Sequence, residues 1–299
     1  MLEMRIRNQM SDEALAPKIG KILQPSDVDV MLTGPSRVLK PDGSPLAVYL
    51  PGAISPELRE EIVPTLQVLK GSYTNNRGLA SGSERVQGAS QRSYARQVDS
   101  AIVGSFEATG PKQYCRLTAW TGRETEKYRG LYPLFRRIAA VFHEHVPDRF
   151  AAQAKLAGET DTFWVVPGTP FTTITVNNTY PTGVHTDKGD LDAGFSTLAV
   201  FRKGEFKGGH LCFPQYRIGV DMQDGDVILM DAHEWHGNTQ FDPEPERKPH
   251  GQLASDPGFE RISVVCYYRT KMASCGSAKD EIERRRLLTE QRAQALVGE

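Results

Sequence analysis

Two potential metal ligands lie two residues apart in the sequence His185-Thr186-Asp187. Side chains at this spacing project from the same face of an extended strand, so both can reach one metal ion. A third candidate is His236, in the sequence HGNT that follows an apolar run ending at Met230. Two histidines and one carboxylate occupy one face of an octahedral iron(II) ion and leave the other positions open for a co-substrate and O2. Zinc hydrolases use similar sets, so these residues alone leave both chemistries open.

Arg261 and Ser263 favour an oxygenase over a zinc hydrolase. They share one face of a predicted strand and can hydrogen-bond the distal carboxylate of 2-oxoglutarate. The neighbouring sequence would bury the guanidinium, and a buried charge is costly unless an anion meets it. The alternative is a structural ion pair between Arg261 and an acidic side chain.

His233 is the main alternative to His236, because HEWH offers two histidines three residues apart. We favour His236 from its HGNT setting. The spacing differs from the HExxH motif of zinc proteases, whose histidines lie four residues apart on one helical face. The remaining histidines are interpreted as structural or peripheral, namely His143, His145, His210 and His250.

The elements that must position these residues change character along the chain. Short runs rich in β-branched and aromatic residues predict a mostly antiparallel sheet in residues 161–270. The runs are FTTITVNN, STLAVFRK, GHLCFPQYRIGVDM, GDVILMDAHEW and RISVVCYYR. Before them, Ser55-Pro56-Glu57 predicts the start of a helix that extends to about Lys70. Apolar residues at helical spacing from Leu134 predict a second helix, and Pro147 the start of a third.

We therefore expect a single oxygenase domain over residues 1–299. Residues 1–54 form an irregular N-terminal arm, residues 55–160 a mainly helical support with a substrate loop, and residues 161–270 the core. Residues 277–299 form a capped C-terminal helix, whose apolar face of Ile282, Leu287 and Leu288 is expected to dock on the core. A long polar segment, residues 241–260, is either a substrate lid or an insertion.

A loop over residues 71–97 is rich in Gly, Ser and Asn and carries a local charge of +3. Its charged residues after Lys70 are Arg77, Glu84, Arg85, Arg92 and Arg96. Such a loop can hold DNA phosphates or can simply be solvated.

Bulk properties limit the remaining function classes. The formal net charge of the 299 residues is −1, which gives no attraction of the whole protein to nucleic acid. No apolar run is long enough to span a membrane, and the start lacks the apolar core of a secretory signal, so we expect a cytoplasmic protein (in the host cytoplasm if phage-encoded). Four cysteines without a CxxC pair predict reduced thiols. No feature indicates an obligate protein partner.

The order HTD, GDVILMD, HGNT and RIS resembles the double-stranded β-helix 2-oxoglutarate oxygenases, and among them the TET/JBP family of DNA base oxygenases. The stretches Asn76-Arg77-Gly78, CRLT from Cys115 and PFTTITVN from Pro170 resemble bacterial and phage members. The resemblance covers approximately residues 71–270. It implies an α+β fold with a jelly-roll core and helices packed on one face. It also implies iron(II), 2-oxoglutarate and O2.

The resemblance also implies site residues and a substrate. By position, His185, Asp187 and His236 would bind iron and act in catalysis, Arg261, Ser263 and Asn177 would bind 2-oxoglutarate, and Asn76, Arg77, Tyr180 and Arg92 would contact substrate. The implied reaction is hydroxylation of 5-methylcytosine in DNA to 5-hydroxymethylcytosine. Thymine hydroxylation in DNA to 5-hydroxymethyluracil, or oxidation of a free small molecule, is the alternative. DNA would be the partner, with the pyrimidine flipped out because a stacked methyl group cannot reach a buried metal. A cupin-like binding protein without turnover is a third hypothesis.

Overall fold

The computed structural model describes residues 1–70, 72–74, 77–81, 98–110, 112–248 and 252–297. The strands are β1 (Leu2–Arg5), β2 (Val30–Leu32), β3 (Ser36–Leu39), β4 (Pro45–Leu50), β5 (Tyr73–Thr74), β6 (Val98–Phe106), β7 (Arg116–Leu117), β8 (Thr173–Asn178), β9 (Ser196–Lys203), β10 (Lys207–Gly208), β11 (Leu211–Phe213), β12 (Ile218–Val220), β13 (Val227–Met230), β14 (Gly237–Asn238), β15 (Phe241–Asp242) and β16 (Glu260–Tyr267). The α-helices are α1 (Asp12–Leu15), α2 (Pro56–Gln67), α4 (Ala119–Arg123), α5 (Thr125–Gly130), α6 (Tyr132–His145), α7 (Pro147–Glu159) and α8 (Ala278–Val297). Short 3-10 turns cover Ala16–Lys18, Pro25–Asp27, Gly78–Ser81, Pro214–Tyr216 and Thr270–Ser274.

The chain divides into two units. The first comprises Met1–Ala101, Thr175–Lys188 and Ser196–Val265, and the second comprises Ile102–Ile174, Gly189–Phe195 and Cys266–Glu299. The largest sheet has the strand order β1-β3-β4-β13-β9-β16-β8-β6-β5, with β7 paired to β6. Strands β6, β8 and β16 each carry residues of both units.

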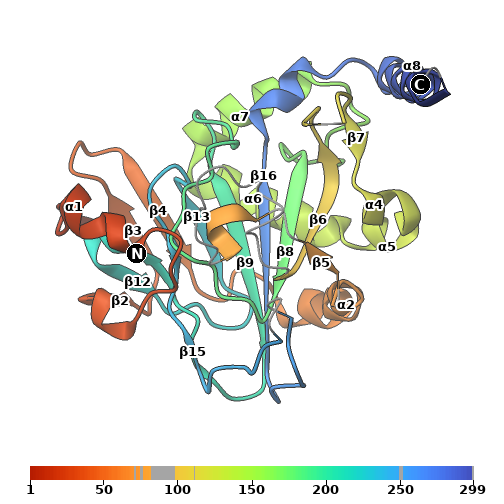
Figure 1. Cartoon of the computed structure of the whole chain (residues 1–299). Coiled ribbons are helices and arrows are strands. Elements are labelled where there is room, and N and C mark those ends of the chain that lie inside the picture. Colours follow the sequence, from red (N-terminus) through yellow and green to blue (C-terminus); the bar gives the residue numbers. More distant parts are fainter. Residues whose placement is uncertain (71, 75–76, 82–97, 111, 249–251, 298–299) are drawn as a thin grey trace. The chain divides into compact units, whose positions relative to one another are not determined.

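The first unit contains two sheets that share one core. In the larger sheet β13 lies between β4 and β9 and is antiparallel to both (Figure 1). Leu229 of β13 lies opposite Val48 and Thr197. The smaller sheet has the order β14-β11-β12-β2. Apolar side chains of both sheets form one buried cluster, which includes Leu46, Tyr49, Leu198, Val200, Ile228 and Met230 from the larger sheet and Leu211, Phe213, Ile218 and Val220 from the smaller. Two sheets that bury their inner faces against each other form the jelly-roll architecture.

Most strand predictions for this unit agree with the structure. The run STLAVFRK forms β9 along its whole length, and Ser55 caps α2 by accepting a hydrogen bond from the backbone N of Leu58 at 3.3 Å. The run GHLCFPQYRIGVDM is divided into β11 and β12. Pro214 begins a 3-10 turn between them, because proline has no N–H to donate to a strand ladder.

The prediction of an irregular arm over residues 1–54 is wrong for four segments. Strands β1, β3 and β4 belong to the larger sheet, and β2 pairs in parallel with β12. These runs are three to six residues long and carry little alternation. Strands β2 and β4 pair with β12 and β13, which lie far away in the sequence, so long-range pairing makes them strands. Strand β3 pairs with β1 and, across a short turn, with β4.

The second unit contains the predicted pair of helices. The apolar stripe of α6 is buried, with Leu134, Ile138 and Phe142 inaccessible to solvent, and α7 begins at Pro147 as predicted. The Phe142 ring stacks on the Phe171 and Phe195 rings, each with a centroid distance of 6.5 Å. These contacts fix α6 against the rest of its unit.

A disulfide between Cys115 and Cys275 also belongs to the second unit, with the two Cα atoms 5.8 Å apart. The prediction that all four cysteines are reduced is therefore wrong for this pair. The pairing could not be predicted, because 160 residues separate the two cysteines in the sequence. Cys212 and Cys266 are free and buried, as expected of reduced thiols.

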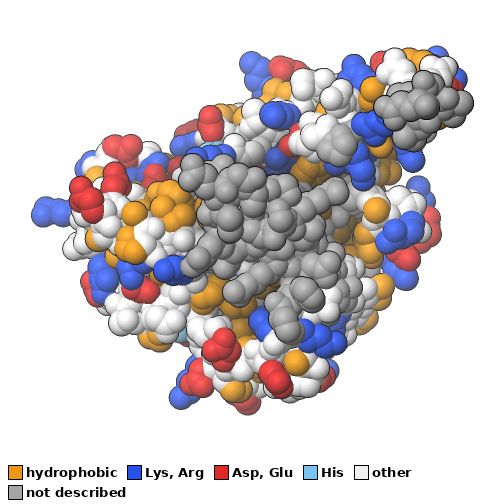
Figure 2. Space-filling view, in the orientation of Figure 1, with side chains coloured by type: hydrophobic (Ala, Val, Ile, Leu, Met, Phe, Trp, Pro, Cys, Tyr) orange, Lys and Arg blue, Asp and Glu red, His pale blue; other side chains and the backbone are white. Residues whose placement is uncertain are grey.

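Helix α8 does not bury the apolar face that the sequence suggested. Ile282 is 64% exposed and Leu287 45% exposed, so their predicted docking on the core is wrong. Charged and apolar side chains both reach the surface of this helix in Figure 2. The helix is held instead at its start, where the Glu281 carboxylate accepts hydrogen bonds from the backbone N–H groups of Cys115 and Gly276. The predicted cap is present, since the Ser277 hydroxyl accepts a hydrogen bond from the backbone N of Asp280.

Candidate metal and co-substrate site

His185, Asp187 and His236 come together in the first unit. One ligand atom from each lies within 4.8 Å of the others. The Nε2 atoms of His185 and His236 each lie 3.5 Å from a different carboxylate oxygen of Asp187. Both imidazoles are buried and the carboxylate is partly exposed. The three potential donor atoms therefore converge on one point from two separate chain segments.

The HGNT sequence explains how the segments meet. The backbones of His185 and His236 exchange two hydrogen bonds, of 2.8 and 3.0 Å, which form an isolated antiparallel bridge. The Asn238 side chain accepts hydrogen bonds from Thr182 N and Oγ1 and donates to the backbone oxygen of His210. Gly237 lies so close to Val184 that a Cβ atom would come within 3.0 Å of its backbone N. The motif thus connects three segments around the candidate ligands.

The imidazole orientations fit a metal ion. The Nδ1 atom of His185 lies 2.7 Å from the backbone oxygen of Gly183, and that of His236 lies 2.9 Å from the backbone oxygen of Glu234. A proton on each Nδ1 leaves each Nε2 lone pair free and directed at the Asp187 carboxylate. Divalent metals bind nitrogen and oxygen at about 2.0–2.2 Å, so two donors on one ion lie about 3 to 3.6 Å apart. The observed separations of 3.5 Å match this requirement.

Electrostatics favour the protonation states that bind metal. Burial, with a contribution from His236, lowers the pKa of His185 to about 4, so its ring is neutral at physiological pH. Burial opposes ionisation of Asp187, but interactions with His185 and His236 hold its pKa below the usual value. A neutral imidazole and an ionised carboxylate are the forms that coordinate a cation.

Arg261 is buried in the same unit, on β16. Its side chain is 5% exposed, and its guanidinium has no ion pair or hydrogen bond with any residue that the structure describes. Burial lowers its pKa to about 10, with a contribution from Arg202 and an opposing one from Asp221. The structural ion pair considered for Arg261 is thus not found in the described part of the chain. A buried guanidinium without an anion indicates a binding site for one.

His210 is a neighbour of this guanidinium that the sequence did not single out. The charge of Arg261 contributes to lowering the pKa of His210, after burial as the main cause, while Asp221 opposes the shift. The Nε2 atom of His210 lies 3.5 Å from an Asp221 carboxylate oxygen, which also lies 3.6 Å from Arg202. Asp221 is therefore already paired. No sequence motif marked His210, because hydrogen bonds of its segment to Asn238 and Thr239, which are distant in the sequence, bring it to this place.

Ser263 and Asn177 also meet in the first unit. Asn177 Nδ2 donates to Ser263 Oγ at 3.2 Å, and Asn177 Oδ1 accepts from Ser100 at 2.8 Å. Ser263 and Arg261 alternate along β16 and share one face. Their role as co-substrate ligands stays a prediction.

Arg77 lies within electrostatic reach of the metal ligands, because its charge contributes to the lowered pKa values of His185 and Asp187. Its Nε is shielded from solvent and has no hydrogen-bond partner among the described residues. The 3-10 turn that follows it contacts the segment that leads to His185, since the Ala80 backbone oxygen accepts hydrogen bonds from Gly183 N and the Tyr180 hydroxyl.

Several predicted residues cannot be placed. Asn76 and Arg92, with Arg85, Arg96 and His250, lie outside the described residues, as does most of the predicted 71–97 loop. His233 is described, and its Nδ1 lies 3.2 Å from the Asp231 carboxylate rather than in the metal cluster. The geometry favours His236 as the third ligand, and the assignment of all three ligands stays a prediction.

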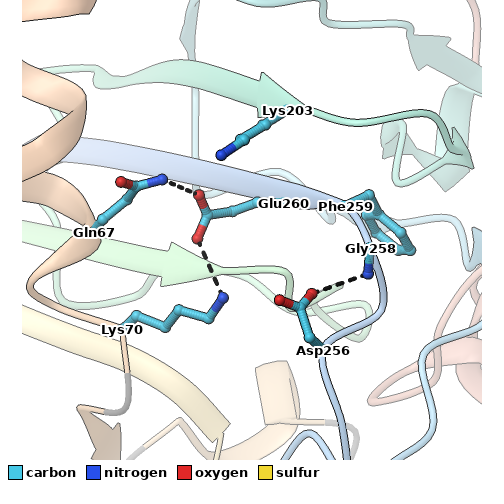
Figure 3. A pocket seen from close by; sticks show the side chains of 7 residues that line it. All are labelled: Gln67, Lys70, Lys203, Asp256, Gly258, Phe259 and Glu260. Carbon is cyan, nitrogen blue, oxygen red and sulfur yellow. Dashed lines mark hydrogen bonds and ion pairs between the residues drawn. The ribbon is translucent and has the colours of Figure 1, made fainter.

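A separate cavity of about 370 Å³ lies at the start of β16 (Figure 3). Its lining residues are Gln67, Lys70, Lys203, Asp256, Gly258, Phe259 and Glu260. The Glu260 carboxylate accepts a hydrogen bond from Gln67 at 2.8 Å and lies 3.8 Å from Lys70. The side chains of neighbouring residues in a strand point to opposite faces, so those of Glu260 and Arg261 lie on different sides of β16. This cavity is not the candidate metal site.

Comparison with known proteins identifies the family. Residues 104–270, more than half of the chain, match the TET/JBP family, which is described as an oxygenase domain of the 2OGFeDO superfamily. The chain belongs to this family. The match contains His185, Asp187, His236 and Arg261, whereas Arg77 precedes it. The predictions of the TET/JBP resemblance and of a 2-oxoglutarate- and iron(II)-dependent dioxygenase are confirmed at the level of the family.

Relatives of known name cover part of the chain. The proteins named thymine dioxygenase JBP1 from Trypanosoma brucei brucei and Leishmania braziliensis are each 32% identical to it over 176 and 180 residues, which are 58% and 60% of this chain. The Crithidia fasciculata protein of that name is 31% identical over 197 residues, or 64% of this chain. The matches cover only 19 to 22% of these relatives, so this chain corresponds to about a fifth of their length.

A solved structure supports the fold. NgTET1 in complex with 5mC DNA superposes with a TM-score of 0.57 at 16% identity and covers 89% of this chain and 90% of its own. Together with the two-sheet core and the family match, this confirms the predicted α+β double-stranded β-helix. Among the described residues, no helix combines the length and apolar character needed to cross a membrane.

Proposed function

We propose that the chain hydroxylates the 5-methyl group of thymine in DNA, with iron(II), 2-oxoglutarate and O2. The observation that carries the reaction class is the buried guanidinium of Arg261, which has no partner among the described residues of the unit that also holds the His-Asp-His cluster. A hydrolytic zinc site has no use for such a group. A dicarboxylic co-substrate supplies the anion that the guanidinium lacks.

The proposed roles follow from the geometry. His185, Asp187 and His236 hold iron(II), with the two imidazoles oriented by backbone carbonyls through Nδ1. Arg261 binds the distal carboxylate of 2-oxoglutarate, and Ser263 on the same face of β16 adds a hydrogen bond. When bound at these residues, iron(II) would supply O2 activation, so that one oxygen atom would enter the substrate methyl group and the other the succinate formed from 2-oxoglutarate with loss of CO2.

Arg77 is proposed to act at the same site. Its charge lies within electrostatic reach of His185 and Asp187, and its buried Nε has a free donor. A cation in this position can meet the negative charge of a bound co-substrate or of the DNA backbone. The roles predicted for Asn76, Tyr180 and Arg92 in substrate contact are kept as part of the proposal.

The choice of base rests on the relatives. The sequence analysis placed 5-methylcytosine first and thymine second, and the similarity to three proteins named thymine dioxygenase reverses that order. The fold is shared with a TET protein solved with 5mC DNA, so 5-methylcytosine is the second candidate. Both bases present a 5-methyl group, and in either case the nucleotide must leave the base stack to reach a buried metal.

The test uses the full chain with iron(II), 2-oxoglutarate and ascorbate on two DNA duplexes that differ only in 5-methylcytosine content. Nucleoside mass spectrometry should detect 5-hydroxymethyluracil in both, and none with His185→Ala. If only 5-methylcytosine were oxidised, the proposed substrate would be 5-methylcytosine and not thymine. Succinate release without any oxidised base would overturn the assignment to DNA and favour a free small molecule. An absence of succinate in all reactions would overturn the oxygenase reading and leave a cupin-like binding protein.

Binding to DNA gives an independent check. A protein that contacts phosphates loses affinity steeply as salt increases, because bound counterions are released. The proposal predicts a DNA affinity that falls between about 50 and 200 mM salt. An enzyme that acts on a free small molecule would show no such dependence.

A further inference from the structure

A partly buried ion cluster involves the segment that carries His236. The Nζ atom of Lys40 is 2.9 Å from the Asp231 carboxylate and 3.3 Å from the Glu234 carboxylate. The three side chains are 16%, 9% and 22% exposed. Lys40 comes from the turn between β3 and β4, far from these acids in the sequence and outside the region that matches the family.

The two carboxylates belong to the segment Asp231–His236, which leads from β13 to the third candidate ligand. The Glu234 backbone oxygen lies 2.9 Å from His236 Nδ1, so it sets the orientation of that imidazole. The Ala232 backbone oxygen accepts a hydrogen bond from Asp187 N at 2.9 Å. Positions of two candidate ligands therefore depend on where this segment lies.

Other contacts hold the same segment at Asp231 and at Glu234. The backbone N of Asp231 donates to Leu46 at 2.9 Å, and the Tyr216 hydroxyl donates to the second oxygen of Glu234 at 2.9 Å. The backbone N of Glu234 also donates to the Asp231 backbone oxygen, at 3.3 Å. Lys40 is the group that joins the carboxylates of Asp231 and Glu234, because its single ammonium bonds both. The Lys40 ammonium therefore restrains both acidic side chains of the segment.

We propose that Lys40 is a positioning residue for the iron site, which it serves by holding Asp231 and Glu234 so that the Ala232 and Glu234 carbonyls fix Asp187 and His236. The inference rests on the proposed function, in that the site is taken to bind iron. Lys40 contacts neither metal nor substrate. Its removal leaves two carboxylates close together in a poorly solvated place, where their repulsion moves the segment. Groups that orient metal ligands typically change metal affinity by about 10- to 100-fold when they are lost.

The test measures metal binding, apart from turnover. Co(II) is titrated into the metal-free full chain and followed by its visible absorption, with parent, Lys40→Met and Lys40→Arg. Methionine keeps the approximate length without the charge, and arginine keeps the charge. We expect Lys40→Met to weaken Co(II) binding by about 10- to 100-fold with an altered absorption spectrum, and Lys40→Arg to recover most of the affinity.

A matched control separates positioning from general stability. Arg269 and Glu107 form a buried ion pair in the second unit, with side chains 22% and 2% exposed, and neither is a candidate ligand. Arg269→Met should lower the unfolding midpoint but leave the Co(II) affinity within about twofold of the parent. Should Lys40→Met fail to fold, Lys40→Met combined with Asp231→Asn removes the repulsion between the carboxylates but still lacks the ammonium that holds both side chains. This double variant should bind Co(II) more weakly than the parent, and parent-like affinity in it would overturn the inference.

The outcomes are distinguishable from those of the proposed function. Equal Co(II) affinity in parent and Lys40→Met, or an equal loss in Arg269→Met, would overturn the inference and leave the proposed function intact. No Co(II) binding by the parent would overturn both. If Lys40→Met weakened Co(II) binding as expected but the parent formed no oxidised thymine, the inference would stand and the proposed substrate would be wrong.

Discussion

Replacement of Arg261 with Met should have two effects of opposite sign. The side chain is 5% exposed and has no counter-ion among the described residues, and burial is the main reason that its pKa falls to about 10. A depression of this size corresponds to about 3 kcal/mol against the charged form in the folded state. Met fills similar space without a charge, so the metal-free variant should be as stable as the parent or up to about 3 kcal/mol more stable.

Co-substrate binding should weaken in the same variant. Removal of a buried, hydrogen-bonded charge partner of a bound carboxylate weakens the binding free energy by about 2–5 kcal/mol, which corresponds to about 30- to 5,000-fold in affinity. Anaerobic calorimetric titration of 2-oxoglutarate into the Mn(II)-loaded chain measures this change. Urea denaturation of the metal-free chain measures the stability.

Arg269→Met is the contrasting control, because this buried guanidinium already has a carboxylate partner in Glu107. It should lose about 3–5 kcal/mol of stability and keep the parent affinity for 2-oxoglutarate. If Arg261→Met instead lost as much stability as this control and bound 2-oxoglutarate within threefold of the parent, the assignment of Arg261 as an anion site would be refuted.

Three further predictions concern the ligands, the disulfide and pH. His236→Ala should abolish detectable Co(II) binding while His233→Ala changes it by less than about threefold, and the reverse result in absorption titrations would make His233 the third ligand. Cys115→Ser should lower the free energy of unfolding by about 2–5 kcal/mol, and identical urea midpoints with and without dithiothreitol in the parent would contradict this. The pKa of Asp231 is lowered because, although burial raises it, the hydrogen bond and charge of Lys40 outweigh that effect. Its stabilisation is therefore present above the unfolded pKa of about 3.9 and is lost as the pH falls through the lower folded value. The destabilisation by Lys40→Met should accordingly be larger at about pH 7 than at about pH 3 in urea denaturation.

The parts of the site that local patterns encode could be predicted. HTD places two ligand side chains on one face of an extended segment, and Arg261 and Ser263 follow the same rule on β16. The residues of β9 and the starts of α2 and α7 were also predictable, because strand propensity, a serine cap and proline at the first helical turn act within a few residues.

The parts that long-range pairing creates could not be predicted. Nothing near His210 in the sequence indicates a site, and it comes within electrostatic reach of Arg261 because Asn238 and the β11–β14 pairing hold its segment there. Strands β2 and β4 have the same cause, since they pair with β12 and β13. Cys115 and Cys275 show no spacing that predicts a disulfide, since only the folded chain brings them together.

A motif therefore identifies the chemistry of this site more readily than the strength with which it holds metal. The proposed donor set is His185, Asp187 and His236, and a chain in which these residues are followed by an arginine like Arg261 suggests the same reaction class. The position of two of these donors depends on backbone carbonyls of the Asp231–His236 segment, and that segment is tied through its carboxylates to Lys40. Because Lys40 lies outside the region that matches the family, a chain could keep the whole motif and still bind iron weakly if it lacked an equivalent cation. Metal affinity is thus the property that distinguishes an intact motif from an intact site.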